Sequence, residues 1–70
     1  MYRYCVIVEQ LTSEDGKPYY TYGIRLRGRK VKVSDVTTQR SIAKHIVSLC
    51  NISQVPPKKL NSFVSTYLDI

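Results

Sequence analysis

The sequence predicts one α+β domain over residues 1–70, a three-stranded antiparallel meander sheet followed by two C-terminal helices packed on one of its faces (βββαα). Two observations carry this prediction. Apolar and polar residues alternate with period two through the first half of the chain, as in half-buried strands. From Thr38 onward, apolar residues instead recur every three or four positions, as in amphipathic helices. A chain of 70 residues suits a single domain with a thin core, since it buries only about 60% of its extended-chain surface.

The strands are predicted at residues 2–11, 19–27 and 30–36. Asp15-Gly16 and Gly28 mark the two turns between them, because glycine adopts positive φ without steric cost. Such short connections favour a meander with the second strand in the centre. The residues expected on the helix-facing side are Tyr2, Tyr4, Val6, Val8, Tyr20, Tyr22, Ile24, Leu26, Val31 and Val33. Those expected on the outer side are Arg3, Cys5, Ile7, Glu9, Tyr19, Thr21, Gly23, Arg25, Arg27, Lys30, Lys32 and Ser34.

The first helix is predicted from Thr38 to Asn51, with Thr37 or Thr38 as its N-cap and Asn51 at its end. Its apolar side comprises Ile42, Ala43, Ile46, Val47, Leu49 and Cys50. The second helix is predicted from Pro57 to about Asp69, because proline suits the first helical position. Its apolar side comprises Leu60, Phe63, Val64, Tyr67 and Leu68. We expect Phe63 to be buried between this helix and the sheet.

The residue types argue against catalysis, a metal site and a cofactor. The chain has one histidine and two cysteines, Cys5 and Cys50, which are far apart and are expected to be free thiols. It has no CxxC motif, no recognisable pair of carboxylates and no glycine-rich phosphate loop. It also has no apolar run of about 18 residues and no signal-peptide pattern. We therefore expect a cytoplasmic, non-enzymatic protein without a membrane partner.

A basic stretch, Arg25 to Lys32, is the most distinctive functional signal. It holds five cations and no acid, in a chain of net charge +6. A basic and open sheet face can follow a phosphate backbone, so DNA or RNA is the predicted partner. The residues predicted to form this surface are Arg3, Tyr19, Arg25, Arg27, Arg29, Lys30 and Lys32. The alternative is a solvated hairpin face whose cations keep the protein soluble and discourage edge-to-edge association.

A second hypothesis has no role for nucleic acid. Cys5 and Ile7 are apolar positions on the outer side of the first strand, where they form a small exposed patch. This patch, or an edge of the sheet, is predicted to bind another protein or a second copy of the chain.

Several short segments, taken in order, resemble a family of short uncharacterised proteins from clostridia-like bacteria. They are Tyr22-Gly23-Ile24, Asp35-Val36-Thr37, Leu49-Cys50-Asn51, and Pro57 with Leu60, Val64 and Leu68. The resemblance covers nearly the whole chain and implies a shared fold, with no activity or functional residues to carry over. Arg40 and Lys44 depart from the acidic residues of the family pattern, and Pro56 stands where that pattern has a serine cap.

Overall fold

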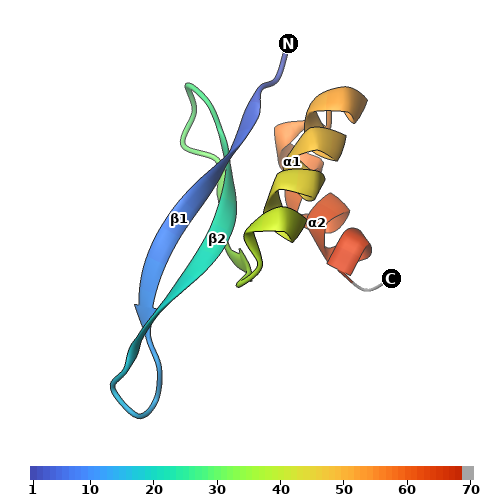
Figure 1. Ribbon diagram of the computed structural model, residues 1–70. Coiled ribbons are helices and arrows are strands. Elements are labelled where there is room, and N and C mark those ends of the chain that lie inside the picture. Colours follow the sequence, from blue (N-terminus) through green and yellow to red (C-terminus); the bar gives the residue numbers. More distant parts are fainter. Residues whose placement is uncertain (69–70) are drawn as a thin grey trace.

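The structure is a computed structural model that describes residues 1–68. It confirms the predicted α+β order of three strands followed by helices (Figure 1). The strands are β1 (Tyr4–Thr12), β2 (Pro18–Leu26) and β3 (Lys32–Thr37). The helices are α1 (Arg40–Ser53), a 3₁₀ turn, η1 (Pro57–Lys59), and α2 (Leu60–Leu68). Asp69, the expected end of the second helix, lies outside the described residues.

The sheet is antiparallel with β2 in the centre, but its two edges differ. β1 and β2 pair without interruption from Tyr4 opposite Leu26 to Thr12 opposite Pro18. β3 is short and irregular, because its residues 34–36 all lie opposite Gly23. Asp35, within this bulge, has a φ of 54° in the left-handed region. Bulges of this kind bend an edge strand away from regular pairing.

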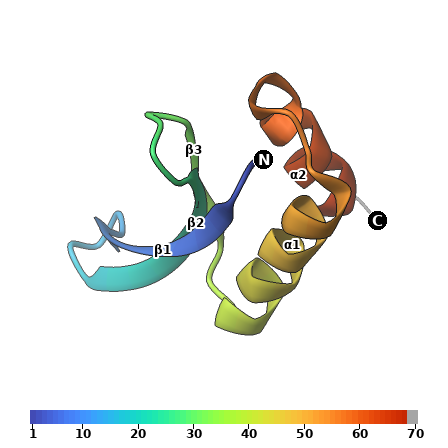
Figure 2. The ribbon, with the colours of Figure 1, turned by 90° about the horizontal axis from the view of Figure 1, so that it is seen from above.

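Both helices cover the same face of the sheet, and the core lies between them and the sheet (Figure 2). The core consists of Tyr4, Ile24, Leu26 and Val36 from the sheet, Ala43, Ile46 and Cys50 from α1, Val55 from the following segment, and Leu60 and Val64 from α2. The hydroxyl of Tyr4 donates to the carbonyl of Val55, so this buried polar group has a partner.

The β1–β2 hairpin extends beyond the helices, which overturns part of the predicted inner face (Figure 1). Val8 and Tyr20 were expected in the core, yet each is 62% exposed. Their side chains do lie on the same side of the sheet as Tyr4 and Ile24. The helices, however, are too short to cover this far end of the hairpin.

The prediction that Phe63 is buried between the second helix and the sheet is also wrong. α2 is anchored through Leu60 and Val64, which are 1% and 3% exposed. Phe63 is half-buried and instead lines a surface pocket with Val55 and Pro56. A nine-residue helix that packs through one narrow stripe leaves the next apolar position at its margin.

The limits of α1 differ from those predicted. Its N-cap is Gln39, without a side-chain cap bond, because Thr37 still belongs to β3 opposite Tyr22. The Thr37 hydroxyl accepts a hydrogen bond from the Gln39 N–H at 3.1 Å. At the other end the helix continues past Asn51 to Ser53, and Gln54 ends it with a left-handed φ of 51°. Asn51 is thus free to act through its side chain.

The two thiols differ in accessibility, which gives a testable prediction. Cys50 is fully buried, and this burial raises its pKa to about 11. Cys5 is half-buried. Because the thiolate is the reacting form, iodoacetamide should label Cys5 faster than Cys50 in the native protein near neutral pH. Mass spectrometry of timed samples measures both rates. In denaturant the difference should disappear, and equal rates in the native state would contradict the packing of Cys50.

Candidate nucleic-acid interface

Four predicted cations gather on the outer face of the sheet, on the side away from the helices. Arg25 is central, since it lies opposite Cys5 of β1 and opposite Lys32 of β3. Arg27 is next to Arg3, because its N–H donates to the Arg3 carbonyl at 2.9 Å. All four side chains are exposed. We call Arg3, Arg25, Arg27 and Lys32 the basic face.

The turn between β2 and β3 adds two more exposed cations, Arg29 and Lys30. The turn closes through a hydrogen bond of 2.9 Å from the Leu26 N–H to the Val31 carbonyl. It bounds a shallow surface pocket of about 280 Å³. The lining residues are Arg25, Arg29, Lys30, Val31 and Lys32, so four of the five are cationic. A pocket lined in this way suits an anionic group such as a phosphate.

The structure does not bring Tyr19 to the basic face. Tyr19 pairs with Leu11 near the far end of the hairpin, roughly 20 Å along the strand from Arg25. Thr21, predicted on the open outer face, is completely buried. Its hydroxyl is 2.8 Å from an Asp35 carboxylate oxygen and 3.1 Å from the Thr37 carbonyl. The β3 bulge therefore covers the middle of the outer face and confines the basic face to one end.

An acidic residue, Glu9, lies at the border of the basic face that is nearer to the end of the β1–β2 hairpin. A Glu9 carboxylate oxygen is 3.8 Å from the Lys32 ammonium, and the other accepts from the Asp35 N–H at 3.1 Å. The basic stretch holds no acid in sequence, but folding brings this one to it. An exposed ion pair contributes at most about 1 kcal/mol, so Lys32 remains able to exchange this partner for a phosphate. The alternation had already placed Glu9 on the outer face, and that was the only sequence signal for this contact.

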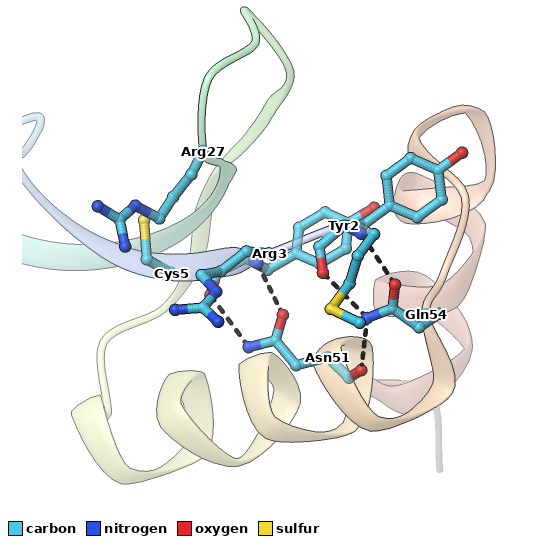
Figure 3. A pocket seen from close by; sticks show the side chains of 8 residues that line it. Tyr2, Arg3, Cys5, Arg27, Asn51 and Gln54 are labelled. Carbon is cyan, nitrogen blue, oxygen red and sulfur yellow. Dashed lines mark hydrogen bonds between the residues drawn. The ribbon is translucent and has the colours of Figure 1, made fainter.

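A second pocket, of about 390 Å³, adjoins the basic face where β1 begins (Figure 3). Its lining residues are Met1, Tyr2, Arg3, Tyr4, Cys5, Arg27, Asn51 and Gln54. Arg3 and Arg27 thus contribute both to this pocket and to the basic face. Cys5, one of the two predicted self-association residues, also lines it, and the other, Ile7, is half-buried beside Gly23.

Two side-chain amides in this pocket connect α1 to the sheet (Figure 3). Asn51 accepts from the Tyr4 N–H at 2.7 Å and donates to the Tyr4 carbonyl at 3.1 Å. Gln54 does the same with Tyr2, at 2.8 Å and 2.9 Å. A primary amide offers one donor and one acceptor side by side, so it replaces the backbone of a neighbouring strand. This role was not predicted, because the sequence around Asn51 indicates only the end of a helix.

One aromatic ring beside these cations, that of Tyr2, already has a cationic partner. The Arg29 guanidinium lies 5.8 Å from the centre of the Tyr2 ring, a cation–π distance. Tyr2 is half-buried. The outer face beside Arg25 is thus a surface of charge rather than of aromatic rings.

Comparisons with known proteins add no identification. No protein-family model matches the chain, and neither the curated proteins nor the solved structures contain a significant match. The resemblance to short clostridial proteins therefore stays a prediction. Within residues 1–68, no helix is long and apolar enough to cross a membrane, and no cluster of three metal-ligating side chains forms.

Proposed function

We propose that the protein is a non-enzymatic module that binds nucleic acid by placing its basic face against the phosphate backbone. The observation that carries the proposal is the gathering of six exposed cations from the residue before β1, from β2, from the β2–β3 turn and from β3. Cross-strand neighbours on a sheet lie about 5 Å apart, so these groups act together on one polyanion. Arginine suits this task because its planar group donates two hydrogen bonds to a phosphate.

We expect duplex DNA to bind better than single strands. Proteins that bind single strands without sequence preference use exposed aromatic rings on which successive bases stack. Tyr19 and Tyr20 are exposed, but both lie at the far end of the hairpin. A twisted pair of strands also fits the major groove of B-form DNA, whereas that of A-form RNA is too narrow to admit side chains.

The test is the salt dependence of binding in an Arg25→Ala/Arg27→Ala double variant. If the wild type contacts about four phosphates of duplex DNA, the slope of log affinity against log salt is near −3.6, from about −0.9 per contact. The double variant should reduce this to about −1.8. Neither side chain enters the core, because both are exposed. Fluorescence anisotropy with a labelled duplex at several salt concentrations measures the slope.

Lys58 and Lys59 provide the matched control. They are exposed in η1, at the start of the second helical segment, and are absent from both pockets beside the basic face. A Lys58→Ala/Lys59→Ala variant loses the same formal charge and should keep most of the affinity. If both double variants lose equal affinity, the effect is one of bulk charge and the basic face is no dedicated site. No binding by the wild type at about 50 mM salt, where screening is weak, would reject the proposal.

A further inference from the structure

The two edges of the sheet are protected to very different degrees. Unpaired strand edges bind other strands unless charge, proline, a bulge or shortness prevents it. β3 is six residues long, begins with Lys32 and contains the bulge at residues 34–36. β1 is nine residues long, pairs regularly throughout, and carries no proline. The edge of β1 is therefore the open one.

Among the residues that the structure describes, only the first part of the β1 edge has hydrogen-bond partners. Arg3 directs its carbonyl toward β2, so alternation directs the backbone groups of the even-numbered residues away from β2. Those of Tyr2 and Tyr4 bind the amides of Gln54 and Asn51. Within residues 1–68, the outward groups of Val6, Val8 and Gln10 bond to no other segment.

The side chains beside this open stretch are apolar. Val8 and Tyr20 are each 62% exposed and lie on the same face of the hairpin, where Val8 pairs with Tyr22 and Gln10 pairs with Tyr20. The one acid of the stretch, Glu9, projects to the opposite face and is engaged with Lys32 and Asp35. An open edge flanked by exposed apolar side chains favours another strand as its ligand.

We propose that this ligand is β1 of a second copy, so that two chains form a continuous six-stranded sheet across a two-fold axis at Val8. The register pairs Val8 with Val8 of the second copy, and Val6 with its Gln10. It satisfies the outward groups of all three residues in both chains, which gives about six backbone hydrogen bonds. The pairing ends where Thr12 lies opposite Tyr4 of the second copy. The backbone of that Tyr4 is already hydrogen-bonded to Asn51 of its own chain.

Charge also favours this register over its neighbours. A centre at Glu9 would set two carboxylates directly opposite each other, which destabilises a strand pair. A centre at Ile7 would require the backbone groups of Tyr4, which Asn51 occupies. The centre at Val8 instead places Arg3 of one chain beside the acidic turn of the other, where Glu14 and Asp15 are exposed. This attraction offsets part of the repulsion between two chains of charge +6.

The two-fold symmetry explains why Val8 and Tyr20 are exposed in a single chain, and why association stops at two chains. A two-fold axis perpendicular to the sheet keeps the helices of both copies on one side. The α1 helix of the second copy, joined to its own β1 through Asn51, then lies beside the hairpin face that carries Val8 and Tyr20. The outer edges of the six-stranded sheet are the two bulged β3 strands, which do not extend it further. Both basic faces share the opposite side, but the dimer does not depend on the proposed nucleic-acid binding.

Sedimentation equilibrium between about 10 µM and 1 mM tests the association. The wild type should dimerise, and Val8→Lys, which places two cations at the two-fold axis, should weaken the dimer at least about tenfold. Ser34→Lys adds the same charge to an exposed residue of the β3 edge and should leave the dimer nearly unchanged. Circular dichroism should show both variants folded, because neither position is in the core. A monomeric wild type at about 1 mM, or equal weakening by both variants, would overturn the proposal.

Disulfide trapping tests the register independently. In a Cys5→Ser background, Val8→Cys should form a covalent dimer in a glutathione buffer, because paired Cα atoms about 5.5 Å apart lie within the range for a disulfide of about 4.4–6.8 Å. Gln10→Cys should not, since the two Gln10 positions would be separated by about four residues along the strands, roughly 13 Å. Cross-linking that is equal, or stronger at Gln10, would refute the centre at Val8.

Discussion

Replacing Ile46 with alanine is expected to lower the free energy of unfolding by about 2–5 kcal/mol. Ile46 is completely buried in α1 and belongs to the same core cluster as Ile24, Leu26 and Leu60. The loss combines the transfer free energy of the removed carbons with the cost of the cavity left behind. A domain of 70 residues has a total stability near the low end of about 5–15 kcal/mol, so much of the population should unfold. Urea denaturation followed by circular dichroism measures the change.

Ile52 makes the matched control, because it is the same residue type in the same helix but is 80% exposed. Ile52→Ala should change the free energy of unfolding by no more than about 0.5 kcal/mol. If both variants had similar midpoints in urea, α1 would not pack on the sheet through Ile46.

Replacing Gly23 with alanine should cost about 1–3 kcal/mol, as overpacking does in a crowded site. A methyl group there would lie 2.6 Å from the Val33 carbonyl oxygen and 3.0 Å from a Glu9 carboxylate oxygen. The carbonyl belongs to the backbone of β3, so a side-chain rotation cannot relieve the contact. The β3 bulge must shift, and with it the hydrogen bonds of Asp35 to Thr21 and Glu9. Urea denaturation again gives the magnitude.

Arg25→Ala is the comparison for this prediction, since Arg25 lies two residues further along the same face of β2. Arg25 is exposed, and its truncation should stay within about 0.5 kcal/mol of the wild type. Should Gly23→Ala prove equally harmless, the close approach of β3 to β2 at this position would be wrong. Urea denaturation of the Arg25→Ala/Arg27→Ala double variant should likewise show near-wild-type stability, so that its loss of nucleic-acid binding does not arise from unfolding.

Some features of the candidate nucleic-acid interface follow from local sequence patterns, and others depend on the tertiary structure. The alternation in residues 19–27 correctly placed Arg25 and Arg27 on the outer face, because successive side chains of a strand point to opposite sides. The pocket around Arg29 and Lys30 depends on how the β2–β3 turn closes. The contact of Glu9 with Lys32 joins two residues 23 positions apart in the sequence, and no local pattern predicts such a pair.

The sequence by itself determined the type and order of the elements and most of the buried apolar positions. Periods of two and of about 3.6 arise from local backbone geometry, so Ile24, Ile46 and Leu60 could be assigned to the core from their neighbours alone. The tertiary structure alone decided where this core ends. Val8 and Ile24 follow the same alternation, but only Ile24 lies beneath the helices. A residue is buried only where another segment packs over it, and the length and placement of α1 and α2 decide which sheet residues they cover.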